Sequence, residues 1–175
     1  MMCFVCVKVP QQVSEILAKT SGVLRGIPGV SVVKEFHITL KFLGDIDEDT
    51  LRMVKTELSK INAESFEVRI GNIGFFPGRN KARVVWAGAN SEGLVRVASD
   101  VESMIRPLGF KPEKFYPHIT LARIKYVRDR NLLESALSKL KLPDLGFYVS
   151  EFFLEKSVLT ASGPIYSDLA VFSLS

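Results

Sequence analysis

The tetrapeptide His-Ile-Thr-Leu occupies residues 37–40 and recurs at residues 118–121, and the 175-residue chain contains no other histidine. Each copy lies in a stretch rich in β-branched and aromatic residues, which is typical of a strand. Because alternate residues of a strand share a face, His and Thr of each motif project together, while Ile and Leu project into a core. The sequence therefore predicts two strands that each present an imidazole and a hydroxyl.

The second motif histidine follows the first by 81 residues, close to half the chain, and the surrounding elements also repeat. In each half, the strand with the motif precedes a helix and then further strands, which favours an internal duplication. We expect an α+β fold of two similar lobes within one domain over residues 1–175. The apolar patterns predict strands over 2–9, 66–76, 83–89 and 115–127 with more in 145–174, and the stretch 30–43 is also rich in strand-forming residues. They predict helices over 10–24, 94–105 and 131–140, and one that begins at the acidic residues after 44 and runs to about 61.

The composition is that of a globular protein, with 47% hydrophobic and 24% charged residues. The net charge of +4 suits a polyanionic partner such as RNA, although many proteins are equally basic. No apolar stretch reaches the roughly 18 to 20 residues that a membrane helix needs, and the N-terminal run does not resemble a signal peptide. We therefore expect a soluble cytoplasmic protein without a membrane partner.

The two cysteines form a Cys-x-x-Cys pattern that we interpret as structural. Cys3 and Cys6 lie in an apolar run that is typical of a buried strand, where residues three apart point to opposite faces. They would not bind one metal together, and no second such pair completes a zinc site. Two buried thiols suggest a reducing, intracellular setting. We expect no metal and no cofactor.

Two imidazoles and two hydroxyls around one small volume would suit phosphoryl chemistry without a metal. One neutral imidazole would take a proton from water, and the other, protonated, would give a proton to the departing alkoxide. The hydroxyls of Thr39 and Thr120 would bind non-bridging oxygens. A single His-x-Thr on a strand means little, but here the duplicate includes every histidine of the chain. A metal site would need at least one more ligand, and no carboxylate lies at a telling spacing.

Longer segments around the motifs resemble a known family. They are Phe-His-Ile-Thr-Leu-Lys-Phe-Leu-Gly at 36–44, Phe-Pro-Gly-Arg at 76–79 with Arg-Val-Val-Trp at 83–86, and Pro-His-Ile-Thr-Leu-Ala-Arg at 117–123. They are similar to the 2H phosphoesterase superfamily, and most to its bacterial and archaeal RNA 2′,3′-cyclic phosphodiesterases, historically called 2′-5′ RNA ligases. The similarity covers essentially the whole chain, and only the N-terminal strand departs somewhat from the family pattern.

The resemblance implies a bilobal fold with two antiparallel β-sheets facing across a central cleft and helices on the outside. It also implies metal-independent hydrolysis of a terminal RNA 2′,3′-cyclic phosphate to a 2′-phosphate. By this analogy His37 is the proton donor to the leaving 3′-oxygen, and His118 is the proton acceptor acting on water. Thr39 and Thr120 would hold the phosphate.

Phe42 and Arg123, each five residues beyond a motif histidine, match positions that the family associates with substrate. An odd offset aims a side chain away from the histidine on a regular strand, so a bulge or strong twist would be required to bring Arg123 into the cleft. Arginine binds phosphate in a bidentate way, but a surface arginine at a strand end is the alternative. For Phe42, core packing and a substrate contact remain open.

Other candidate substrate contacts lie outside the motifs. Arg79 and Lys81 belong to a basic loop that either contacts the RNA backbone or is an ordinary solvated turn. Tyr116 precedes a proline and is therefore extended; it either lines the cleft or packs at the strand start. We expect Phe75 and Phe76 to belong to the core.

The leading hypothesis is a phosphodiesterase acting on an RNA end or on a small cyclic nucleotide. A 2′-5′ RNA ligase or 2′-5′ phosphodiesterase at the same site is an alternative, since a 5′-hydroxyl can attack in place of water. A non-catalytic RNA-end-binding protein is another, which the intact His and Thr of both motifs argue against. A metal-binding module is the least favoured. A self-contained pair of motifs makes a monomer sufficient.

Overall fold

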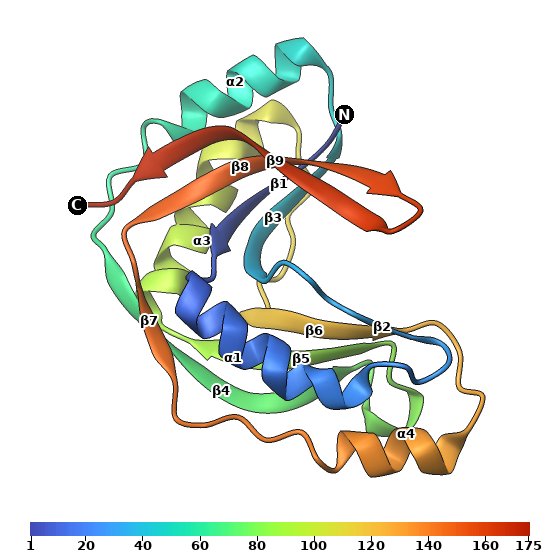
Figure 1. The fold of residues 1–175 in the computed structure, drawn as a ribbon. Helices are drawn as coiled ribbons and strands as arrows, with labels where there is room; N and C mark the ends of the chain where they lie inside the picture. The colour runs from blue at the N-terminus through green and yellow to red at the C-terminus, as the bar shows by residue number, and fades with distance from the viewer.

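The computed structural model describes residues 1–175 and has two antiparallel sheets with helices packed outside them (Figure 1). The first sheet has the order β3-β1-β8-β9, and the second has the order β2-β6-β5-β4-β7. The strands are β1 (Met2–Lys8), β2 (Val30–Val32), β3 (His37–Asp45), β4 (Phe66–Phe76), β5 (Val84–Asn90), β6 (His118–Ile124), β7 (Gly146–Val149), β8 (Glu151–Thr160) and β9 (Gly163–Ser173). The expected α+β architecture of two lobes is confirmed.

Four helices cover the sheets: α1 (Gln11–Ser21), α2 (Glu48–Leu58), α3 (Glu92–Ile105) and α4 (Arg130–Leu137). Three of them begin at a side-chain cap, because Asp47, Ser91 and Asp129 each accept a hydrogen bond from the backbone N–H three residues later. None of the helices is both long and apolar enough to cross a membrane.

The stretch 30–43, which contains the first motif, forms two strands in different sheets. β2 pairs with β6 in the second sheet, whereas β3 pairs with β1 in the first. The chain crosses between the sheets at Val33 and Phe36: the Val33 N–H donates to Leu121 O, and Phe36 O accepts from Val9 N–H. This crossing brings the first motif strand close to the second motif strand, and β3 contacts β6.

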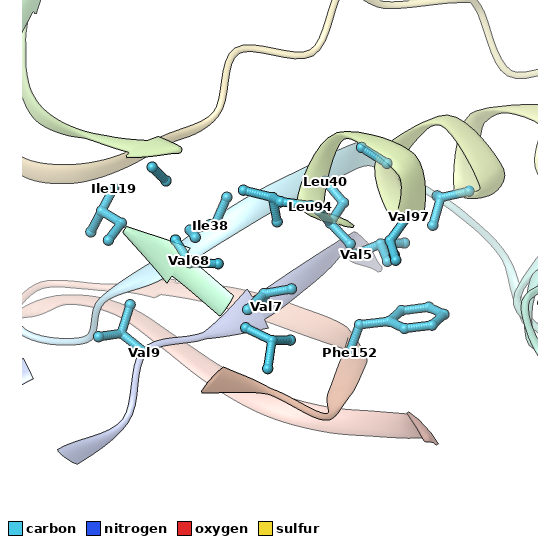
Figure 2. Close-up of a cluster of buried hydrophobic side chains, with 14 of the residues drawn as sticks. Val5, Val7, Val9, Ile38, Leu40, Val68, Leu94, Val97, Ile119 and Phe152 are labelled. Carbon is cyan, nitrogen blue, oxygen red and sulfur yellow. The ribbon is translucent and has the colours of Figure 1, made fainter. Parts of the chain in front are cut away.

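One large hydrophobic core spans both lobes (Figure 2). Its members come from the inner faces of both sheets and from α1, α2 and α3, and include Val5, Val7, Ile38, Leu40, Val68, Leu94, Val97, Ile119 and Phe152. The motif aliphatics therefore point into the core, as their alternation predicts. A smaller cluster lies under α4 and contains Val85, Ala122, Leu133 and Leu137.

The two cysteines are free and buried in different clusters, so their opposite orientations on β1 are confirmed. Cys3 belongs to the large core, and Cys6 packs with Phe4 and Phe153 on the other face. Burial raises the pKa of both thiols above the ordinary value, because the thiolate is poorly solvated there.

Candidate active site

The second motif strand contains a β-bulge that decides where Arg123 points. The pairing of β6 with β5 passes over Leu121, so that Thr120 and Ala122 lie opposite consecutive residues of β5. Leu121 and Ala122 are therefore both buried, and the alternation resumes with the opposite phase. Arg123 is consequently exposed on the face that carries His118 and Thr120. The required bulge is present.

The first motif strand contains the same bulge at the same position. The pairing of β3 with β1 passes over Leu40, and Leu40 and Lys41 are both buried. The next residue, Phe42, is 61% exposed and lies on the face of His37. The alternative that Phe42 packs in the core is therefore wrong, because the bulge turns its side chain away from the interior. The duplication extends from the sequence to this backbone irregularity.

The two motif strands β3 and β6 contact each other, and charges on β6 act on the histidine of β3. Arg123 and His118 both contribute electrostatically to the lowered pKa of His37, although they belong to the other sheet. Together with burial, which is the largest cause, they lower the pKa of His37 from 6.5 to about 4. In the ligand-free protein His37 is therefore neutral at pH 7.

His118 is oriented by the main chain immediately before it. Its Nδ1 lies 2.6 Å from the carbonyl oxygen of Tyr116. Because a carbonyl oxygen only accepts hydrogen bonds, Nδ1 carries the proton, and in the neutral ring Nε2 keeps its lone pair. This tautomer leaves Nε2 able to accept a proton from a ligand or from water.

Aromatic rings flank both histidines. Phe76 lies edge-on to His118 with a centroid distance of 5.1 Å, and Trp86 lies 6.2 Å away. Phe4 and Tyr166 flank His37 at 5.1 and 5.3 Å. The expected core position is wrong for Phe76, because its ring borders the His118 imidazole. Phe75, in contrast, packs partly against the cluster under α4. The flanking rings pack against both imidazoles.

Arg123 is the cation of this region that has no acidic partner. Lys8 pairs with His37 in the β1–β3 ladder, but its Nζ lies 2.6 Å from Asp168 and 3.2 Å from Glu155. Burial raises the pKa of Glu155 to about 7, with the neighbouring Asp168 contributing. None of the ion pairs in the structure involves Arg123. Its guanidinium is free to bind an anion.

The remaining sequence candidates lie at the edges of this arrangement. Tyr116 is 53% exposed, so it does not pack as a core residue, and its ring contacts Phe76 edge-on at 6.0 Å. Arg79 and Lys81 form a short turn between β4 and β5, where Arg79 pairs with Glu134 of α4. Nowhere do three or more His, Cys, Asp or Glu side chains gather closely enough to hold a metal ion.

We expect the His37 imidazole to titrate near pH 4 in the ligand-free protein. Replacing Arg123 by Gln removes one of the two nearby positive charges and should raise the pKa of His37. The pKa should stay below 6.5, because burial is the larger cause. A pH titration of the histidine ring protons by NMR, with the two signals assigned from His37→Gln and His118→Gln variants, measures this shift.

The same pKa makes a prediction about stability. Because His37 binds its proton less readily in the folded state, the unfolded state takes up more protons between pH 6.5 and about 4. The free energy of unfolding should therefore decrease as the pH falls through this window, and Arg123→Gln should reduce the decrease. If the NMR titration of His37 had the same midpoint in the Arg123→Gln variant as in the wild-type protein, the guanidinium would not approach the imidazole.

The sequence matches the family described as LigT like Phosphoesterase twice, over residues 7–86 and over residues 88–166. The chain belongs to this family. Each matched stretch contains one motif strand with its bulge, and each of the two sheets takes strands from both stretches.

Several relatives and solved structures agree with this membership. The RNA 2′,3′-cyclic phosphodiesterase of Methanocaldococcus jannaschii is 33% identical over 170 residues, covering 95% of this chain and 96% of the relative. That of Archaeoglobus fulgidus is 36% identical over 177 residues, covering 98% and 99%. The crystal structure of TT0787 of Thermus thermophilus superposes with a TM-score of 0.86 at 29% identity, covering 99% and 97%. The chain is a LigT-like phosphoesterase, a hydrolase of phosphodiester bonds.

Proposed function

We propose that this chain hydrolyses a terminal RNA 2′,3′-cyclic phosphate to a 2′-phosphate without a metal ion. The observation that supports the proposal is that His118 and the unpaired Arg123 share one face of β6, which contacts the strand of His37. An acid, a base and a cation for the phosphate are the groups that this reaction needs. The names of the relatives support the choice of an RNA end as the substrate.

In the proposed mechanism the phosphate is held by Arg123 and by the hydroxyls of Thr39 and Thr120. His118 takes a proton from water through Nε2, and the water oxygen attacks phosphorus. The bond from phosphorus to the 3′-oxygen breaks, and the 3′-oxygen takes the proton of His37. The products are a 2′-phosphate and a 3′-hydroxyl, with the proton returned between the two imidazoles through solvent.

A proton donor must be charged when the substrate is bound, and His37 is neutral in the ligand-free protein. The bound phosphate anion supplies the missing stabilisation. It lies between Arg123 and His37, offsets the positive charge that lowers the His37 pKa, and accepts a hydrogen bond from the imidazolium. The proposal thus requires the pKa of His37 to rise on binding, and a bell-shaped dependence of kcat on pH.

The same site would also join RNA ends if a 5′-hydroxyl replaced the attacking water, so a 2′-5′ ligase or 2′-5′ phosphodiesterase activity accompanies the proposal as a minor reaction. Phe42, on the face of His37, is a candidate contact for the terminal base or ribose. The core shared by both sheets supports one domain over residues 1–175, in which a monomer has a complete site.

The experiment uses a short RNA ending in a 2′,3′-cyclic phosphate, incubated with the enzyme in EDTA, with the product's phosphate read by ³¹P NMR. We expect full turnover and a 2′-phosphate, because protonation of the 3′-oxygen selects the bond that breaks. A 3′-phosphate product would reverse the assignment of the leaving oxygen. Activity that EDTA abolishes and a divalent metal restores would reject the metal-free mechanism.

A further inference from the structure

Lys41 is a buried cation in the first motif strand. On a regular strand it would share the face of His37, because residues four apart point the same way. The bulge instead buries it together with Leu40, and its side chain is only 2% exposed. The equivalent residue of β6 is Ala122, which is also buried. The bulge therefore directs a charged group into the interior at only one of the two motifs.

The Lys41 ammonium is held by groups from other parts of the chain. Its Nζ lies 3.0 Å from the carboxylate of Glu102 in α3, and it donates to the carbonyl oxygen of Lys111 at 2.5 Å. The carboxylate of Glu113 lies 3.8 Å away. Lys111 and Glu113 belong to the 109–117 segment, which leads into β6 and runs beside β3 (Figure 1). Lys41 therefore ties the first motif strand to the segment that precedes the second.

This segment has few bonds of its own. No backbone group of residues 110–116 takes part in a hydrogen bond to another backbone group. The rings of Phe110 and Phe115 pack against the core, but apolar contacts give a carbonyl group no fixed direction. Pro112 and Pro117 stiffen the segment, because a proline fixes its own φ and restricts the residue before it. A stiff segment moves as a unit, so a polar anchor near its start also fixes the position of its end.

The end of the segment contains the carbonyl group that orients His118. The Nδ1 of this histidine lies 2.6 Å from the carbonyl oxygen of Tyr116. The next residue, Pro117, is fixed to β5, because its carbonyl accepts from the N–H of Ala89 at 3.2 Å. The Tyr116 carbonyl therefore lies between the anchor at Lys41 and the anchor at β5.

Neither packing nor the bulge explains why position 41 is a lysine. A buried charge is costly unless it is paired and hydrogen-bonded, and apolar residues in place of a buried ion pair are often no less stable. Ala122 occupies the equivalent position of β6, so the bulge itself needs no charge. The directional bonds from Lys41 to the 109–117 segment are what an apolar side chain could not supply.

We propose that Lys41 is a positioning residue for His118. It anchors the 109–117 segment so that the Tyr116 carbonyl keeps the proton on Nδ1 of His118 and leaves the lone pair on Nε2. The expected effect on turnover rests on the proposed function, in which Nε2 takes a proton from water. The first motif strand thus acts on both imidazoles, because it carries one and orients the other.

The test combines Lys41→Met with Glu102→Gln, so that the anchor is lost without leaving an unpaired buried charge. The ring nitrogen chemical shifts of neutral His118, measured by NMR without substrate, report which nitrogen carries the proton. The wild-type protein should show one protonated and one unprotonated nitrogen, and in the variant the two shifts should converge as the tautomers exchange. For a cyclic phosphate, kcat should fall about 10- to 100-fold while KM changes less than about twofold, because a misplaced base acts on the transition state alone.

Two further variants identify the group responsible. Glu102→Gln alone removes the carboxylate but keeps the bond from Lys41 to Lys111, so both His118 shifts should stay as in the wild type. Lys60→Met combined with Glu57→Gln makes the same changes at a surface ion pair at the end of α2, and should alter neither His118 nor kcat. Unchanged shifts and kcat in the folded Lys41 variant would overturn the proposal, as would converging shifts in Glu102→Gln alone.

A measurement on the wild-type protein tests the anchor even if the Lys41 variant does not fold. The Lys41 ammonium should exchange slowly with water and show an NMR coupling through the hydrogen bond to the carbonyl carbon of Lys111. An ammonium that exchanges as rapidly as that of the exposed Lys60 would overturn the proposal. A wild-type enzyme without turnover would instead reject the proposed function, and the His118 shifts would still test the anchor.

Discussion

Replacing His118 by Ala is expected to lower kcat for a 2′,3′-cyclic phosphate by about 10²- to 10⁴-fold. The imidazole is held by the hydrogen bond from its Nδ1 to the Tyr116 carbonyl, so that Nε2 keeps the lone pair which, in the proposed mechanism, takes a proton from the attacking water. His37→Ala should cause a loss of similar size, because the leaving 3′-oxygen then departs without a proton. Initial rates at saturating substrate measure both losses.

The double variant separates a paired mechanism from two independent effects. If the two imidazoles act in one step, His37→Ala combined with His118→Ala should be little slower than the worse single variant. Thermal unfolding and circular dichroism should show that all three variants remain folded, because neither imidazole belongs to the large hydrophobic core. A folded double variant with wild-type activity would reject the paired-histidine mechanism.

The largest expected loss of stability is at Phe152 in β8. Its side chain is 0% exposed, lies in the core shared by both lobes and stacks on Phe172 with a centroid distance of 4.9 Å. Phe152→Ala removes this contact area and leaves a cavity, which typically costs about 3–5 kcal/mol. The urea dependence of unfolding, followed by circular dichroism, measures the change in the free energy of unfolding.

Phe42→Ala is the matched control for this substitution, because it deletes the same ring from a site that is 61% exposed. We expect a change within about 0.5 kcal/mol. The difference between the two variants then reports burial and not the chemistry of phenylalanine. If Phe152→Ala cost no more than Phe42→Ala, the two lobes would not share the core described here.

The sequence predicts much of this fold because the signals are local. The motif strands show a two-residue alternation, α3 shows its apolar spacing, and Asp47 caps α2 within three residues. The repeated motif also predicts two lobes. The sequence predicts that the Arg123 side chain points into the cleft only if the strand contains a bulge, and it leaves the side chain of Phe42 open. A bulge depends on which residues of two strands lie opposite each other. That register is a property of long-range pairing and leaves no local pattern.

The aromatic residues around the histidines are the part of the site that sequence reasoning missed. Phe4 and Tyr166 come from β1 and β9, and Trp86 comes from β5. Nothing near these residues in sequence distinguishes them from core aromatics. Phe4 and Trp86 reach the imidazoles because β1 lies beside β3 and β5 lies beside β6, whereas Tyr166 reaches His37 although two strands separate β9 from β3. Only the folded sheets bring them together.

The bulge that both motif strands contain also makes the two halves of the site different from each other. Two lobes with equivalent histidines and threonines would present the same groups to a ligand entering either way round. The bulges, however, deliver different side chains to equivalent positions, a phenyl ring at Phe42 and a guanidinium at Arg123. A nucleotide is likewise one-sided, with an uncharged ring system at one end and an anion at the other. In the proposed site, therefore, the residues just beyond the motifs determine which oxygen of the cyclic phosphate faces which imidazole. The two lobes are nearly symmetric, but the substrate binds between them in a single orientation.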